Sequence, residues 1–141
     1  MDEQKNATKP TANNTPSPHG KKLLCIEDEH FIGELYSRAL TKAGYDVTVI
    51  IDGMEGLKEA QTDKYDIILL DLMIPSLTGI EILRKLRDST QTPKLHSKII
   101  ITTNLEQREE VRADIEKQAD GYIVKAEVTP RELVEFVSTV A

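Results

Sequence analysis

The sequence predicts an α/β fold in which helices cover both faces of a doubly wound parallel sheet. Three observations support this prediction. Short apolar runs alternate along the chain with segments of helical periodicity. Four of the runs are apolar throughout, which is typical of parallel strands buried on both faces. Each of these four runs ends at a polar or charged residue, so polar groups are expected along one edge of the sheet.

Composition limits the class of protein. The 141 residues suffice for one compact domain, and 39% hydrophobic with 30% charged residues is ordinary globular material. The net charge of −6 and the mixing of basic with acidic residues over 108–114 argue against direct nucleic-acid binding. No apolar run approaches the roughly 20 residues that span a bilayer, and no signal peptide is evident. The one cysteine, Cys25, is expected to behave as a small buried hydrophobic residue. We expect a cytoplasmic protein that does not bind membranes.

Two regions follow from the order of these patterns. Residues 1–20 contain three prolines and almost no large apolar residue, so we expect a disordered N-terminal tail. Residues 21–141 form the single domain. Its strands are expected at 21–26, 45–51, 66–70, 98–101 and 121–124. Helices are expected from about 29 to 43 and from about 106 to 119. Further helices are expected after Gly53, after Gly79 and from Thr129-Pro130 onward.

The first two helices are predicted from apolar stripes that follow strands. In 29–43 the stripe is formed by Phe31, Leu35, Ala39 and Leu40, and Gly44 is a suitable C′ residue. The strand at 45–51 is rich in β-branched residues. The turn Asp52-Gly53 then opens a short helix whose apolar residues are Met54, Leu57 and Ala60.

The remaining helices have similar signals. The helix after Gly79 turns its isoleucines and leucines inward, and the charged helix over 106–119 has Val111 and Ile115 on its stripe. The last helix has the strongest start signal, with a capping Thr129, Pro130 at N1 and Glu132 at N3.

Five strands that alternate with five helices favour the flavodoxin-like strand order 2-1-3-4-5. Ligands of such sheets bind beyond the carboxyl ends of the strands, at the switch point between strands 1 and 3. Strand 1 ends in Glu27 and Asp28, and strand 3 ends in Asp71. The predicted topology and the acidic residues therefore point to the same place.

Three carboxylates at one sheet edge predict a cation site. Two like charges about 4 Å apart repel by roughly 4 kcal/mol at an effective dielectric near 20. Hard oxygen ligands suit Mg²⁺. A carboxylate such as Asp71 can also act as a nucleophile toward phosphorus. The transferred phosphoryl group then needs its oxygens stabilised, and Lys125 and Thr102 end strands at suitable positions.

At this point the motifs match a known family. From Lys21 to its end, the chain resembles the receiver domain of two-component response regulators. The matching segments are Leu24-Cys25-Ile26-Glu27-Asp28-Glu29, Asp66 through Gly79 with its Met-x-Pro-x-x-x-Gly loop, Ile101-Thr102, and Gly121-Tyr122-Ile123-Val124-Lys125. Together, in this order, they form a highly specific signature that covers nearly all of residues 21–141.

The resemblance implies a role for each site residue. Asp71 would accept a phosphoryl group from the phosphohistidine of a sensor histidine kinase or a phosphotransfer protein. Asp28, Asp71 and the backbone carbonyl of Met73 would bind Mg²⁺, with Glu27 acting mainly through a metal-bound water. Lys125 would pair with Asp71 and then with the phosphoryl group.

The resemblance also implies how the signal leaves the domain. Thr102 would move toward the phosphoryl group and Tyr122 would follow inward, which changes the surface of the fourth helix, fifth strand and fifth helix. That surface would bind a downstream protein target or support a phosphorylation-dependent dimer. The domain would be no enzyme beyond its own phosphorylation and dephosphorylation. It would be a stand-alone receiver, which must act through another protein, or a fragment of a longer regulator.

Two residues depart from the family pattern. Ala126 stands where the family commonly has a proline with a cis bond; a cis bond before a non-proline residue costs about 2.5–4 kcal/mol. A trans bond and a differently placed loop are therefore expected after Lys125. Thr103 stands where the family often has Ala or Gly, and its bulk should hinder attacking water and slow dephosphorylation.

Two other functions fit the fold class. An aspartate-nucleophile phosphatase would need a general acid soon after Asp71, which Leu72 and Met73 cannot provide. A flavin-binding domain would need a phosphate loop after strand 1, where acidic residues instead repel phosphate. The histidines give weak signals: His30 is expected at the surface beside the acids, and His96 in a loop without an evident partner.

Overall fold

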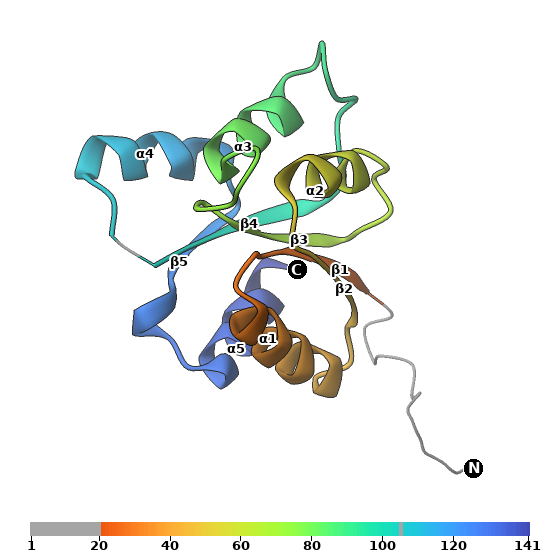
Figure 1. Ribbon diagram of the computed structural model, residues 1–141, viewed down its shortest axis with the longest axis vertical. Coiled ribbons are helices and arrows are strands. Elements are labelled where there is room, and N and C mark those ends of the chain that lie inside the picture. Colours follow the sequence, from red (N-terminus) through yellow and green to blue (C-terminus); the bar gives the residue numbers. More distant parts are fainter. Residues whose placement is uncertain (1–20, 105) are drawn as a thin grey trace.

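The computed structural model describes residues 21–104 and 106–141, and its centre is a five-stranded parallel sheet. Figure 1 shows the sheet between two layers of helices. The strands lie in the order β2-β1-β3-β4-β5, which confirms the predicted flavodoxin-like topology. Their bounds are β1 Lys22–Ile26, β2 Asp46–Ile50, β3 Ile67–Asp71, β4 Lys98–Thr103 and β5 Gly121–Val124.

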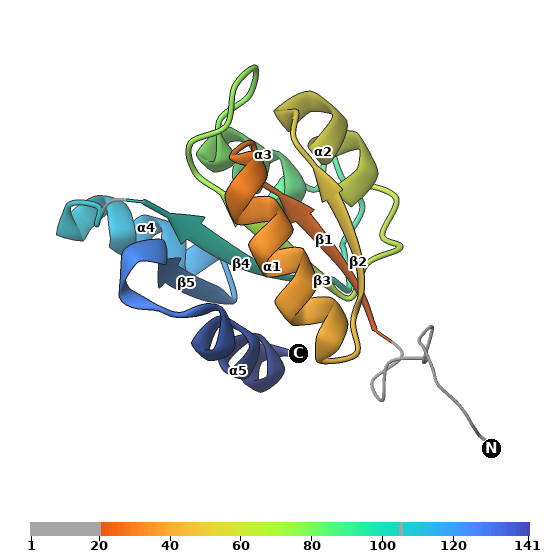
Figure 2. The same ribbon diagram turned by 60° about the horizontal axis from the view of Figure 1, so that its bottom comes forward.

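Five α-helices cover the two faces of this sheet. Figure 1 shows α2, α3 and α4 on one side and α1 and α5 on the other, and Figure 2 brings the pair α1 and α5 forward, side by side. Their bounds are α1 His30–Lys42, α2 Gly53–Ala60, α3 Gly79–Arg87, α4 Glu109–Gln118 and α5 Pro130–Val140, with a 3₁₀ turn η1 at Lys125–Glu127.

The core consists of two apolar layers, one on each face of the sheet. Because side chains alternate along a strand, Leu24 and Ile26 pack beneath α2 and α3, while Leu23 and Cys25 pack beneath α1 and α5. All five residues of β3 are buried, as expected of a central parallel strand. The prediction that Cys25 is a small buried residue is confirmed.

Local signals in the sequence account for most helix ends. Thr129 caps α5, and its side chain and that of Glu132 form the reciprocal bonds of a capping box. Thr78 and Glu81 make the same box at the start of α3. Gly44 follows α1 with φ of 108°, a conformation that glycine adopts without the steric cost of a Cβ.

Several boundaries and two side chains differ from the predictions. Strand β4 continues to Thr103, strand β3 includes Asp71, and α4 begins only at Glu109. Phe31 and Met54 were expected to face the core but are 73% and 47% exposed. Each lies in the first turn of its helix, close to the carboxyl edge of the sheet, where the apolar layers end. The buried residues of α1 and α2 lie further along each helix, beyond its first apolar residue.

The predicted disordered tail over residues 1–20 lies outside the described residues. Within the described part of the chain, every helix is too short or too polar to cross a membrane.

Candidate functional site

The acidic residues converge at the carboxyl edge of the sheet because their strands are neighbours. Strand β1 pairs with β3 through Ile26 and Leu70, the residues that precede Glu27 and Asp71. One carboxylate oxygen each of Glu27, Asp28 and Asp71 lies within 4.8 Å of the other two. Glu27 and Asp71 are each only 1% exposed, and Asp28 is half-buried.

Lys125 brings the balancing positive charge from the far side of the sheet. It follows β5, and its Nζ lies 2.7 Å from Glu27 Oε1 and 3.1 Å from Asp71 Oδ2. Asp71 Oδ2 and Lys125 Nζ are both buried without a hydrogen bond of good geometry among the described residues. Two buried polar atoms therefore face each other with bonding capacity to spare for a further group.

Burial and charge shift the protonation equilibria of this cluster. Burial raises the pKa of Glu27 to about 7, and the charge of Asp71 adds to the effect, whereas the Lys125 ammonium opposes it. Burial alone would lower the pKa of Lys125. The contacts with Glu27 and Asp71 outweigh it, so the pKa of Lys125 is raised and this side chain stays charged.

The loop after Asp71 is held in place by backbone and side-chain bonds. The Met73 N–H donates to Asp71 Oδ1 at 3.1 Å, and the Gly79 N–H donates to the Leu72 carbonyl at 3.0 Å. A Cβ at Gly79 would collide with the Asp71 carbonyl, so only glycine permits this closure. Further along, the Ser76 hydroxyl donates to Asp52 at 3.0 Å and so ties the loop to the start of α2.

The donor set fits a hard divalent cation. Three carboxylates face one ammonium within the cluster, which leaves an excess of negative charge in a largely buried place. Carboxylate oxygens in such a group are the ligands that Mg²⁺ prefers. The described residues contribute no His or Cys ligand to the group that would favour a softer metal.

The other predicted residues surround this cluster. Thr102 pairs with Asp71 in the sheet register, and both Thr102 and Thr103 are buried. Tyr122 is already buried, with the Arg112 guanidinium 4.4 Å above its ring and Glu106 Oε1 3.5 Å from its hydroxyl. The described chain contains no cis peptide bond, so the bond before Ala126 is trans. His30 is exposed at the start of α1.

The structure adds two contacts that the sequence did not predict. Glu27 is the nearest partner of Lys125, although a water-mediated metal contact was expected of this residue. Glu29 Oε1 lies 3.8 Å from the same ammonium, and the Glu29 N–H donates to Glu27. Strands β1 and β5 are not neighbours, so these contacts depend on the reach of the lysine side chain. In the sequence, these contacts with Lys125 were indicated only by the acidic run Glu27-Asp28-Glu29.

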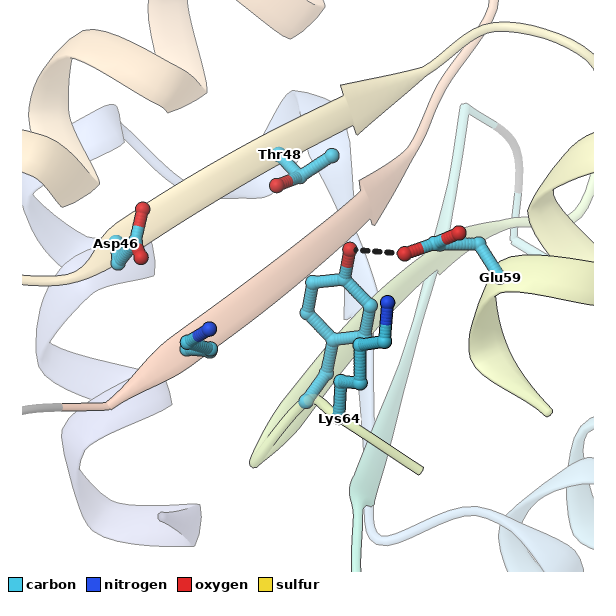
Figure 3. A pocket seen from close by; sticks show the side chains of 6 residues that line it. Asp46, Thr48, Glu59 and Lys64 are labelled. Atoms are coloured by element: carbon cyan, nitrogen blue, oxygen red, sulfur yellow. Dashed lines mark hydrogen bonds between the residues drawn. The ribbon is translucent and has the colours of Figure 1, made fainter. Parts of the chain in front are cut away.

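Hollows also lie near and away from the acidic cluster. A groove of about 490 Å³ runs between α1 and β2 and borders the cluster at Glu27, and it is also lined by His30, Val49 and Ile51. A smaller hollow of about 160 Å³ lies between β2 and α2 (Figure 3), where the Tyr65 hydroxyl donates to Glu59 at 2.7 Å. Charged side chains of both signs line the smaller hollow, so its electrostatics favour neither anions nor cations.

Known proteins resemble this chain in sequence. Alkaline phosphatase synthesis transcriptional regulatory protein PhoP of Bacillus subtilis is 39% identical over 113 residues, which are 80% of this chain and 45% of that protein. Response regulator ArlR of Staphylococcus saprophyticus is 40% identical over 104 residues, which are 74% of this chain and 45% of that protein. The chain therefore spans less than half the length of these relatives.

Solved structures show the same likeness in three dimensions. Chemotaxis protein CheY4 of Vibrio cholerae superposes with a TM-score of 0.72 at 29% identity and covers 86% of this chain and 98% of its own. The Francisella response regulator 1452 receiver domain gives 0.73 at 28% identity, with coverages of 85% and 95%. The family model of the response regulator receiver domain matches residues 23–138. The chain belongs to the response regulator receiver domain family.

Proposed function

We propose that this chain is a phosphorylation-dependent signalling switch that accepts a phosphoryl group on Asp71. The observation that carries the proposal is the buried Asp71 carboxylate, paired with Lys125 and crowded by Glu27 and Asp28. A carboxylate oxygen of Asp71 attacks phosphorus, the P–N bond of the donor phosphohistidine breaks, and the imidazole leaves with the electron pair.

Residues of this chain stabilise the transferred group. Lys125 pairs with a phosphoryl oxygen in place of the Asp71 oxygen it now faces, and the Thr102 hydroxyl donates to a second. Asp28, Asp71 and the Met73 carbonyl would hold Mg²⁺, and Glu27 would act mainly through a water; the ion would supply positive charge near the remaining phosphoryl oxygens. The bulk of buried Thr103 limits the access of water and slows the loss of phosphate.

The phosphoryl donor is a protein, a sensor histidine kinase or a phosphotransfer protein. Asp71 is nearly inaccessible, so a donor must be brought against the rim of the pocket. Exposed apolar side chains lie on elements at or near this edge, at Phe31, Val49, Ile51, Met54 and Met73, among charged residues such as Glu29. Exposed apolar side chains gathered at one edge favour docking of a protein surface.

The signal leaves through the surface of α4, β5 and α5. The Tyr122 ring is already buried in this structure. A shift of Thr102 therefore changes the contacts of Tyr122 with Arg112 and Glu106 and does not have to draw the ring inward. A downstream protein target binds the altered surface, or two phosphorylated copies pair through it. We expect a cytoplasmic domain with no direct nucleic-acid contact and no turnover of external phosphoesters, whether it acts alone or within a longer regulator.

Incubation with Mg²⁺ and acetyl phosphate, followed by intact mass measurement, tests the proposal. The wild type should gain one phosphoryl group, and Asp71→Asn should gain none because its amide is not nucleophilic. Asp66→Asn is the matched control, since it removes a carboxylate at the other end of the same β3 segment and should leave phosphate uptake unchanged. Phosphorylation of Asp71→Asn at the wild-type rate would remove the assignment.

A further inference from the structure

His96 lies far from the acidic cluster, between two carboxylates at the amino edge of the sheet. Its Nδ1 is 2.8 Å from Asp63 Oδ1 and its Nε2 is 3.1 Å from Asp66 Oδ1. The sequence suggested no partner for this histidine, and the structure corrects that reading. The three side chains come from two segments, with His96 in the loop between α3 and β4 and both acids in the turn between α2 and β3.

Both carboxylates are committed as acceptors by other bonds. Asp63 Oδ1 also accepts from the His96 backbone N–H at 3.0 Å. Asp66 Oδ2 accepts from the Lys22 backbone N–H at 2.9 Å. A backbone N–H can only donate, so Asp63 Oδ1 faces the ring as an acceptor. The Lys22 bond to Oδ2 lowers the pKa of Asp66 and so favours the ionised carboxylate, whose Oδ1 accepts from the ring. Asp63 adopts φ of 57° in the turn that carries it, a conformation that Asp tolerates better than most residues.

Two acceptors that face the two ring nitrogens require two protons on the ring. A neutral imidazole carries one N–H and one lone pair, and a lone pair turned toward a carboxylate is repelled. We propose that His96 is held as an imidazolium that staples the α3–β4 loop to the α2–β3 turn and, through Asp66, to the start of β1. The staple loses one of its two ring bonds when His96 gives up a proton.

The surrounding charges agree with this state. Hydrogen bonds from the ring to Asp66 and Asp63, and the charges of both acids, raise the pKa of His96 above its ordinary value of 6.5, although burial acts the other way. The Lys22 backbone bond lowers the pKa of Asp66, with smaller contributions from His96 and from Lys21 on the β1 side. The other basic residues of these segments are Lys64 in the turn, Lys94 in the loop and Lys98 at the start of β4.

The sign of the pH dependence follows from these shifts. A histidine whose pKa is raised by folding stabilises the fold fully below its unfolded pKa of about 6.5, and the gain is lost as pH rises through the folded pKa. An aspartate whose pKa is lowered stabilises the fold above its unfolded pKa of about 3.9. The staple therefore acts most strongly between the unfolded pKa values of Asp and His, and it weakens as the pH rises through the raised pKa of His96.

The staple is independent of the phosphorylation site. Asp66 precedes β3 and Asp71 ends it, so the two lie at opposite edges of the sheet. Tyr65 links the staple to the hollow of Figure 3, because its carbonyl accepts from the Ser97 hydroxyl at 2.6 Å while its own hydroxyl reaches Glu59. The staple thus fixes a loop and a strand start without touching Glu27, Asp28 or Lys125.

The ring can be observed directly by NMR in the wild-type protein. Long-range ¹H–¹⁵N spectra of the imidazole should show both His96 nitrogens protonated at about pH 6, with a midpoint above 6.5. The midpoint should fall in Asp66→Asn and in Asp63→Asn. A wild-type midpoint at or below 6.5, or a ring nitrogen without a proton at about pH 6, would overturn the proposal.

Equilibrium unfolding gives a second, independent test. His96→Gln should lower the folding constant about two- to fivefold near pH 5.5, the range of exposed ion pairs, and by a factor near one around pH 8.5. His30→Gln is the control, since His30 is also exposed but lies at the other edge. A His96→Gln effect that stays constant with pH would contradict the staple. Phosphate uptake by His96→Gln should equal that of the wild type.

Discussion

The two edges of the sheet place similar groups in different surroundings. At the carboxyl edge, Glu27 and Asp71 pair with the Lys125 ammonium and all three are buried. At the amino edge, Asp63 and Asp66 pair with His96, whose side chain is 53% exposed. Both edges hold carboxylates in excess over basic groups, so composition does not separate them.

The difference lies in what else balances the negative charge. At the amino edge, the carboxylates are open to solvent and accept from the Lys22 and His96 backbone N–H groups. At the carboxyl edge, water is largely excluded, and Asp71 Oδ2 and Lys125 Nζ retain unused bonding capacity. Charges interact more strongly where solvent does not screen them. The exposed group therefore serves to hold segments together, whereas the buried group is poised to bind a further charged species.

Removal of the buried ammonium should produce the largest effect. Lys125→Met leaves Glu27 and Asp71 buried without their positive partner, and loss of one member of a buried ion pair typically costs about 3–5 kcal/mol. Urea unfolding without Mg²⁺ near neutral pH measures the change. Lys98→Met, at an exposed position on β4, should change stability by less than about 0.5 kcal/mol. If both variants lost similar amounts of unfolding free energy, burial would not explain the difference between the two edges.

The pH dependence of the carboxyl edge should be the next largest effect. Because burial raises the pKa of Glu27 from 4.5 to about 7, the folded state holds a proton that the unfolded state has already lost. Stability without Mg²⁺ should therefore fall by about 2–3 kcal/mol as pH rises through this window. Glu27→Gln should remove that slope. A slope that persists in the variant would assign the proton to another group.

Added Mg²⁺ should stabilise the carboxyl edge alone. At about ten- to thirtyfold excess over the dissociation constant, binding to the folded state adds about 1–2 kcal/mol. Thermal unfolding with and without Mg²⁺ measures the gain, which Asp28→Asn should reduce because it removes one of three clustered carboxylates. His96→Gln should keep the whole gain. Equal stabilisation of the Asp28→Asn variant and the wild type would exclude Asp28 as a ligand.

The sequence predicted most of the fold because its signals are local. Apolar runs marked four strands and β-branched residues marked the fifth, and the cap at Thr129 with Pro130 placed the start of α5 within one residue. The meeting of Glu27, Asp28 and Asp71 followed from strand order alone, since parallel strands end at one edge. The capping box of Thr78 and Glu81 has the same Thr-x-x-Glu pattern as that of Thr129 and Glu132. The sequence predicted the helix after Gly79 but not this box.

What could not be predicted depends on the ends of long side chains and on the limits of the core. Helical periodicity assigns Phe31 and Met54 to the apolar stripe, but it cannot show that the first turn of each helix extends past the core. The Glu27–Lys125 contact crosses two intervening strands. The partners of His96 lie 30 and 33 residues away, in a turn whose backbone geometry aims Asp63 at the loop.

The burial of Cys25 has a practical consequence for measuring the switch. It is the one cysteine of the chain, and burial, with the nearby charge of Glu27, raises the pKa of its thiol to about 12. Fluorophores and spin labels attach through thiolates, so this residue should stay unlabelled while the protein is folded. A cysteine introduced on an exposed position of α4 would then carry the sole reporter, and the native background would need no alteration.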